Sequence, residues 1–161
     1  MILDFLFEIW RRLNASLQWR LLWLINSKFM VSVAGIVYNH EGQILLQRHR
    51  HWVDDVWGLP GGIVENGESL EHAFSREVLE ETGLEISDIE LVKIVSGFSL
   101  RIEAYFRGIL LETEPEQIIK IQQKEIVEAK FFALDKLPTN ILQMHRDLIF
   151  HESMKTISNR T

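Results

Sequence analysis

The sequence contains no cysteine, which excludes disulfide bonds, thiolate metal sites and cysteine nucleophiles. It also lacks an excess of basic residues, because 17 lysines and arginines stand against 23 aspartates and glutamates, giving a formal net charge of -6. Proteins that bind nucleic acid backbones gather lysine and arginine, so nucleic acid is not the expected main partner. A chain without cysteine is compatible with a reducing compartment, and we expect a cytoplasmic protein.

A long hydrophobic run is absent as well. The longest unbroken stretch of large apolar residues is 21–25, far short of the roughly 20 residues that a helix needs to cross a bilayer. The N-terminus has neither the basic start nor the small-residue cleavage site of a signal peptide. We therefore expect neither a membrane span nor a secretion signal in this segment.

The length and composition fit one compact domain. The chain has 161 residues, of which 47% are hydrophobic and 10% aromatic, enough to bury a core but too few for two full domains. We expect a helical extension over residues 1–28, the domain itself over 29–157, and a frayed tail over 158–161.

The extension predicts two helices. In residues 2–13 the apolar side chains recur at helical spacing, and they are Ile2, Leu6, Ile9 and Leu13. Residues 17–25 are apolar nearly all round and include Trp19 and Trp23. Packing on the domain, or on a second copy as a homodimer, is the favoured interpretation. Contact with an anionic membrane surface is the less favoured one, suggested by four basic residues against two acidic ones.

The remaining pattern predicts strands around one central helix. Residues 29–38 and the apolar ILLQR stretch flank the turn NHEG and indicate a hairpin, and 89–96, 101–111 and 126–134 also favour strands. A helix over 69–82 should end at Gly83, and a last helix should start near 138–140 and run toward residue 151. The order indicates an α+β, mixed α/β layered domain.

Three glutamates on the central helix raise an electrostatic problem. At 100° per residue, Glu77, Glu80 and Glu81 lie close to the apolar stripe of the helix rather than opposite it. Two carboxylates about 6 Å apart repel each other by roughly 3 kcal/mol at an effective dielectric of about 20. A positive group among them is therefore expected, and a hard cation such as Mg²⁺ or Mn²⁺ suits oxygen ligands best.

The residues around these acids follow a fixed spacing. The chain reads Gly62, five residues, Glu68, seven residues, then Arg-Glu-Val-Leu-Glu-Glu-Thr-Gly-Leu over 76–84. This arrangement resembles the Nudix box of the MutT-like Nudix hydrolases at every position. The similarity extends to WGLPGG at 57–62, ILLQRHR at 44–50 and EIVEAKFF at 125–132. It implies the Nudix fold, a mixed sheet sandwiched between helices, with residues 1–28 outside the common core.

The resemblance also implies an activity and a site. It implies hydrolysis, with Mg²⁺ or Mn²⁺, of a nucleoside diphosphate linked to another moiety. The implied metal ligands are the carboxylates of Glu77, Glu80 and Glu81 and a carbonyl at Gly61, and Glu80 and Glu81 are also catalytic candidates. The implied structural positions of the box are Gly62, Glu68, Arg76 and Gly83, with Arg76 and Glu68 tying the loop to the helix.

The general base, which accepts the proton of the attacking water, has candidates both within the box and beyond it. Metal ions lower the pKa of bound water and hold it in line with phosphorus, but the water's proton still needs an acceptor. Glu125 is the leading candidate, because it directly precedes the expected strand at 126–134. Glu80 and Glu81 are alternatives within the box, and Glu128 is a further candidate.

Substrate contacts are expected from two regions. The basic aromatic loop before WGLPGG contributes Arg48, Arg50 and His51, and the strand region after the helix contributes Phe98 and Arg101. A plainer interpretation makes His49 and His51 solvent-facing loop residues and Trp57 a core residue. Three functions stay open: hydrolysis of an ADP-ribose or nucleotide-sugar-like compound, which is favoured, a housecleaning nucleoside triphosphate pyrophosphatase, and a non-catalytic nucleotide-sensing module.

Overall fold

The computed structural model describes residues 2–52, 55–98, 100–112 and 117–158. For residues 2, 3, 5, 6, 98 and 156–158 it describes the backbone alone. The predicted tail thus begins at the last turn of the final helix, and residues 159–161 lie outside the described residues.

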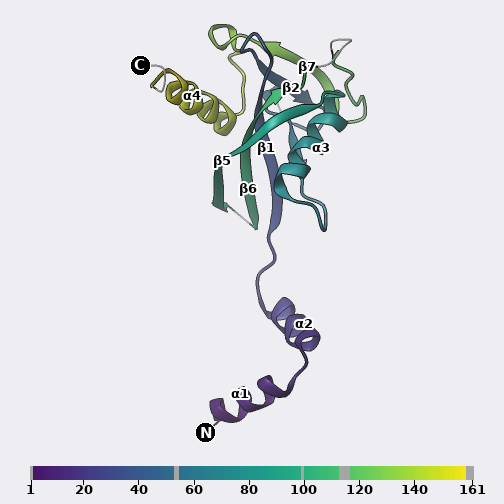
Figure 1. Cartoon of the computed structure of the whole chain (residues 1–161), viewed down its shortest axis with the longest axis vertical. Coiled ribbons are helices and arrows are strands. Elements are labelled where there is room, and N and C mark those ends of the chain that lie inside the picture. Colours follow the sequence, from purple (N-terminus) through teal and green to yellow (C-terminus); the bar gives the residue numbers. More distant parts are fainter. Residues whose placement is uncertain (1, 53–54, 99, 113–116, 159–161) are drawn as a thin grey trace.

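A mixed sheet forms the centre of the molecule (Figure 1). Its strands are β1 (Met30–Tyr38), β2 (Ile44–His49), β3 (Trp57–Gly58), β4 (Gly61–Ile63), β5 (Ile86–Phe98), β6 (Arg101–Leu110) and β7 (Ile126–Phe132). The strand order is β3-β2-β1-β6-β5, with β4 added beside β1 and β7 beside β2. β1 runs parallel to β6, and the other pairs, including the predicted hairpin of β1 and β2, are antiparallel.

Helices cover both faces of this sheet (Figure 1). On one face α3 (Leu70–Thr82) buries Phe74 and Val78 against the side chains of Val33 and Phe106. On the other face the cluster contains Leu148 and Ile149 from α4 (Gln143–Ser158), together with residues of β1, β2 and the predicted core residue Trp57. The alternation of side chains along each strand supplies both cores. The predicted layered α+β fold is confirmed.

The position of α3 is fixed at both ends and in its middle. Ser69 Oγ accepts a hydrogen bond from the His72 N–H at 3.2 Å, and Gly83 ends the helix with a φ of 71°. Between these caps, the Phe74 ring lies against Gly35 so closely that a Cβ there would be 2.5 Å from Phe74 Cζ. Helix and sheet therefore pack at a distance that only a glycine in β1 permits.

The last helix starts later than the sequence predicts. Residues 138–142 are not helical, because part of the segment bridges to β3. The Trp57 N–H donates to the Asn140 carbonyl at 2.9 Å, and the Leu142 N–H donates to the Trp57 carbonyl at 2.9 Å. These bonds and the bridge of Trp57 with Ile141 hold the segment on the sheet. A short 3₁₀ turn, η2 (Leu134–Lys136), precedes it. α4 then runs beyond residue 151, to Ser158.

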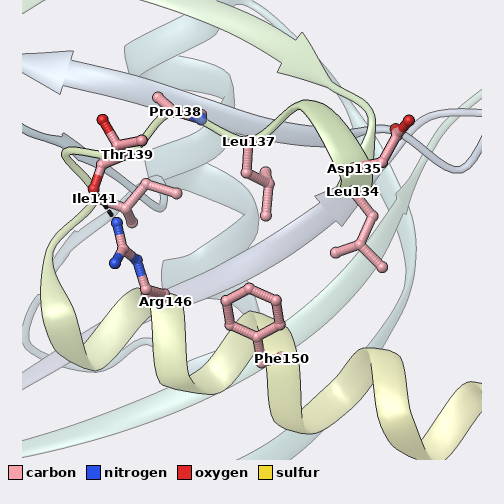
Figure 2. Close-up of a pocket in the computed structure, with 8 residues that line it drawn as sticks. All are labelled: Leu134, Asp135, Leu137, Pro138, Thr139, Ile141, Arg146 and Phe150. Atoms are coloured by element: carbon pink, nitrogen blue, oxygen red, sulfur yellow. Dashed lines mark hydrogen bonds between the residues drawn. The ribbon is translucent and has the colours of Figure 1, made fainter.

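A hollow of about 310 Å³ lies between this bridging segment and α4 (Figure 2). Its walls are mostly apolar, and the guanidinium of Arg146 at its edge donates to the Thr139 carbonyl. The residues that line it are Leu134, Asp135, Leu137, Pro138, Thr139, Ile141, Arg146 and Phe150. Only one acid is among them, so this hollow does not resemble the predicted site.

The two predicted N-terminal helices are present as α1 (Ile2–Arg12) and α2 (Ala15–Ile25). Asn14 caps α2 by accepting from the Leu17 N–H at 2.9 Å. Both helices project away from the sheet (Figure 1), and no residue of α2 is buried. The favoured interpretation of packing on the domain is therefore wrong for this structure, and a homodimer stays a prediction. Within the described part of the chain, no helix is long and apolar enough to cross a membrane.

Candidate active site

A cleft of about 520 Å³ opens beside the N-terminal end of β4. It brings together residues of β2, β4, α3 and the segment before β7, and they are His49, Gly61, Gly62, Ile63, Glu65, Arg76, Glu77, Glu80, Glu81, Gln122 and Glu125. The three glutamates expected to bind metal, Glu77, Glu80 and Glu81, and the leading base candidate Glu125 are in this set, and the further candidate Glu128 is not.

Glu81 is the most deeply placed of these acids. Its residue is only 3% exposed, and its Oε2 accepts a hydrogen bond from the Gly61 N–H at 3.0 Å. Burial, together with the nearby charges of Glu77 and Glu125, raises the pKa of Glu81 to about 8. The Gly61 hydrogen bond opposes this rise because it favours the charged form.

Glu77 lies against the loop that carries the two glycines. Its side chain is 15% exposed, and its Oε1 accepts from Arg76 Nη1 at 2.9 Å. Burial raises the pKa of Glu77, and the hydrogen bond from Arg76 lowers it. A Cβ at Gly62 would lie 2.3 Å from the carboxyl carbon of Glu77. Gly62 therefore supplies the space that this carboxylate occupies.

Glu80 faces outward more than the helical geometry predicts. Its side chain is 53% exposed, and its Oε2 accepts from Arg76 Nη1 at 3.2 Å. The expectation of a core-directed carboxylate holds for Glu77 and Glu81 and is wrong for Glu80. The difference follows from its position at the open side of the cleft, where the stripe of α3 meets solvent.

Arg76 connects the loop to the helix. It donates to Glu68 through Nε at 3.1 Å and through Nη2 at 2.8 Å, and Nη2 also donates to the Ile63 carbonyl at 3.1 Å. The same Glu68 carboxylate accepts from the Glu65 N–H at 2.6 Å. The hydrogen bonds from Arg76, with that from Glu65, lower the pKa of Glu68 to about 2. The arrangement matches the expected loop-to-helix pair.

The donor atoms of the cleft fit a hard divalent cation. They are carboxylate oxygens with backbone carbonyls nearby, which is the ligand chemistry of Mg²⁺ and Mn²⁺. In this structure, however, no group of three or more acidic or histidine side chains among the described residues converges enough to hold a metal ion. Arg76 holds Glu77 and Glu80 instead, and Gly61 holds Glu81. The ligand assignment stays a prediction.

The two candidate bases outside the box are in different places. Glu125 lines the cleft, with a half-exposed side chain whose Oε2 is 3.7 Å from His49 Nε2. Glu128 lies instead in an ion-pair cluster, where it accepts from Arg48 Nη2 at 2.6 Å and pairs with Lys130. Hydrogen bonding to Lys130 lowers the pKa of Glu128. Glu125 is therefore placed to act in the cleft and Glu128 is not.

The predicted substrate residues are dispersed. Arg48 is occupied by Glu128 and by Asp55 at 2.5 Å, so its guanidinium stays outside the cleft. Arg50 donates to the Gln123 carbonyl at 3.0 Å, and the exposed His51 is also outside the cleft-lining set. The side chain of Phe98 lies outside the described residues. His49, which the plainer interpretation placed in solvent, is instead mostly buried and lines the cleft.

Sequence reasoning did not predict Ile63, Glu65 or Gln122 as residues of the cleft. Of these, Gln122 is joined to the central helix, because its N–H donates to the Glu81 carbonyl at 3.0 Å. The segment before β7 has no periodicity that would place a glutamine beside the helix. Its only sequence signal is its position shortly before Glu125.

A second polar cluster, on the α4 side of the sheet, was also missed. Tyr105 is 1% exposed, and its hydroxyl donates to Glu103 Oε2 at 2.7 Å. Arg101, a predicted substrate residue, donates to Glu103 Oε1 at 2.8 Å and to Ser32 Oγ at 2.9 Å. His145 packs edge-on to Tyr105, and its Nδ1 accepts from the Leu59 N–H at 2.9 Å. Burial lowers the pKa of His145 to about 4.

Comparisons with known proteins agree with this geometry. A family model described as NUDIX domain matches residues 28–151. The NAD-capped RNA hydrolase NudC of Salmonella heidelberg is 32% identical over 103 residues, which are 64% of this chain and 39% of that protein. Putative nudix hydrolase 1 of Caenorhabditis elegans is 32% identical over 125 residues, 72% of this chain and 32% of that protein. The chain spans well under half the length of these curated relatives.

Solved structures show the same fold. The MutT protein of Methanosarcina mazei Go1 superposes with a TM-score of 0.62 and 25% identity, over 82% of this chain and 98% of that one. The NUDIX domain of Shewanella oneidensis NrtR, complexed with ADP ribose, gives a TM-score of 0.65 and 19% identity over 92% and 97%. The box spacing, the fold and the family match lead to one conclusion: the chain belongs to the NUDIX domain family.

Proposed function

We propose that this protein is a divalent-metal-dependent pyrophosphohydrolase that cleaves the diphosphate of a nucleoside diphosphate linked to another group. Hydrolases of this family generally need divalent metal ions. The observation that carries the proposal is the cleft itself, which Glu77, Glu80 and Glu81 of α3 line together with Gly61 and Gly62 of β4. An acidic cleft of this kind repels a diphosphate unless cations bridge the two.

The side chains of the cleft have distinct tasks under this proposal. A divalent cation bound there would neutralise phosphate oxygens and lower the pKa of a water molecule. Glu77 and Glu81 would hold it from the buried side, and Glu80 from the solvent side. The half-exposed carboxylate of Glu125 would accept the proton of the attacking water, because it lines the same cleft from outside α3.

The substrate class is inferred from two printed descriptions of similar proteins. NudC is a hydrolase of NAD-capped RNA, and the NUDIX domain of NrtR binds ADP ribose. Both ligands contain an adenosine diphosphate linked to a ribose. We therefore expect ADP-ribose, NAD⁺ or a nucleotide sugar to be a substrate, and the net charge of -6 favours the free nucleotide over an RNA.

A product analysis tests the proposal. Purified full-length protein is incubated with ADP-ribose, NAD⁺, nucleotide sugars and nucleoside triphosphates, each with Mg²⁺, with Mn²⁺ or with a chelator. Release of a nucleoside monophosphate and a phosphorylated second product, only with metal, supports the proposal. Release of pyrophosphate from triphosphates alone would instead identify the housecleaning pyrophosphatase. Tight nucleotide binding without any turnover would identify a sensing module.

A further inference from the structure

The second N-terminal helix, α2, is apolar on every side over its last turn and a half. Residues 21–25 are five consecutive large apolar residues, which at 100° per residue surround the helix. Trp23 is 66% exposed and Ile25 is 78% exposed. A groove on a protein covers one side of a helix and would leave the others in water. The surrounding that suits this segment is apolar around most of its circumference.

Tryptophan rings and basic side chains lie beside the apolar residues of α2, as they do where hydrocarbon meets water. Trp19 is 72% exposed and forms, with Trp23 and Leu24, a shallow apolar hollow that Arg20 borders. At the end of the helix, Lys28 Nζ lies 4.7 Å from the centre of the Trp23 ring. Tryptophan rings and basic side chains are the residues that gather where hydrocarbon meets lipid headgroups.

Charge separates this extension from the rest of the chain. Residues 1–28 contain four basic and two acidic residues, although the whole chain has a net charge of -6. Glu8 already pairs with Arg11 at 2.6 Å and with Arg12 at 3.6 Å. Among the described residues, Arg20 takes part in no ion pair, and Lys28 donates only to backbone carbonyls and contacts the Trp23 ring. Arg20 and Lys28 thus flank the most exposed apolar part of the helix, and no acidic side chain among the described residues pairs with either of them.

A second copy of α2 is a poor counterpart. A symmetric pair of α2 helices, through whichever face, leaves the other apolar sides of residues 21–25 in water. Where the contact face includes Arg20, the middle residue of Ala15–Ile25, a centred pair also brings Arg20 close to its equivalent. Like charges at that position repel, and the rest of a second copy offers an acidic body rather than an apolar one. The interface of an anionic lipid layer supplies both an apolar surrounding for residues 21–25 and negative charge beside Arg20 and Lys28. We propose that α2 and its flanking cations form an anchor that inserts into the interface of an anionic lipid membrane.

Vesicle binding by the full-length protein tests this anchor. Flotation is measured with vesicles of phosphatidylcholine and with equimolar phosphatidylcholine and phosphatidylglycerol, at low and high salt. We expect binding to the anionic vesicles that weakens with salt and is much weaker on phosphatidylcholine. The double variant Trp19→Ser, Trp23→Ser should lose this binding, and Arg20→Gln should weaken it about fivefold, the effect of one basic residue near an anionic surface.

A matched control uses another exposed apolar residue. Ile118 is 73% exposed outside the extension, and Ile118→Ser should leave vesicle binding unchanged. Circular dichroism of each variant checks that the fold is kept. The proposal is overturned if the protein ignores both kinds of vesicle, if it binds them equally, or if the double variant still binds. It is also overturned if the protein is a dimer without vesicle affinity and the double variant is a monomer.

Discussion

The Gly61 N–H and the Glu81 carboxylate are joined by a hydrogen bond of 3.0 Å that spans the cleft from strand β4 to helix α3. It fixes the deepest acid of the site to the backbone, where only a proline at position 61 would remove the donor. Among the described residues, the carboxylate of Glu80, one residue earlier, pairs with Arg76 alone, at 3.2 Å, and it is half exposed. The carboxylate of Glu81 is thus held in one position, whereas the adjacent carboxylate of Glu80 can change its position.

Glu80→Gln should reduce turnover by roughly two to four orders of magnitude, because it removes a charge that metal or proton transfer requires. The fold should stay intact, since Glu80 is half exposed. Steady-state kinetics with Mg²⁺ and a thermal unfolding curve measure both effects. Glu71→Gln, on the exposed first turn of α3, is the matched control and should behave as wild type. Near-normal turnover of the Glu80 variant would remove this residue from the mechanism.

Glu125→Gln should lower kcat about 100-fold or more, without weakening Mn²⁺ binding, because this carboxylate is proposed to accept a proton rather than to hold the metal. Glu128→Gln should leave kcat within a fewfold of wild type, since Glu128 pairs with Arg48 away from the cleft. Turnover and Mn²⁺ titration by calorimetry give the two quantities. Equal losses of kcat in the two variants would contradict the assignment of Glu125.

Gly62→Ala should displace the Glu77 carboxylate, because the new Cβ would lie 2.3 Å from its carboxyl carbon. We expect weaker Mn²⁺ binding and lower turnover. Gly42→Asn is the control: its φ of 73° suits asparagine, and nothing lies within 4 Å of a Cβ there. Unchanged Mn²⁺ affinity in the Gly62 variant would mean that Glu77 does not bind metal.

Arg76→Lys should lower both the melting temperature and the metal affinity, because a single ammonium cannot reach Glu68, Glu77 and the Ile63 carbonyl together. Arg107→Lys, which changes an exposed pair with Glu90, should shift the melting temperature much less. Differential scanning calorimetry compares them. A melting temperature as high as that of wild type would show that the loop does not depend on the guanidinium.

Acid should destabilise the protein partly through His145. Its pKa falls from the usual 6.5 to about 4 on folding because it is buried. The unfolded chain therefore takes up the proton first as the pH falls, and stability is lost between about pH 6.5 and 4, by up to about 3 kcal/mol. Urea unfolding across this range measures the slope. His145→Asn, which can still accept from the Leu59 N–H, should flatten it, and the exposed His151→Asn should not.

Local patterns predict the elements that local forces determine. The boundaries of α3 follow from Ser69 and Gly83, and the two N-terminal helices follow from apolar spacing. The start of α4 does not, because hydrogen bonds of the backbone N–H and carbonyl of Trp57, far away in sequence, hold residues 140–142 out of the helix. A pairing of this kind leaves no periodic signal in the segment that it straightens.

The acids of the cleft are predictable for the same reason, and the contacts of the basic loop are not. Glu77 and Glu81 lie where helical geometry places them, on the buried side of α3. Arg48 has a partner, Glu128, on a neighbouring strand whose register the sequence does not reveal. A basic side chain that the sequence offers as a substrate contact is thus neutralised by an acidic side chain on the neighbouring strand.

The close packing of Phe74 on Gly35 limits how the protein can adapt to a ligand. Because ring and backbone are in contact, α3 has no room to slide or roll over the sheet without first lifting away from it. We therefore expect the outer parts of the cleft to accommodate a ligand, because the half-exposed Glu80 carboxylate can exchange its guanidinium neighbour for it. Helix α3 and the sheet keep their relative position, and the groups that respond to a ligand are a few side chains at the outer part of the cleft.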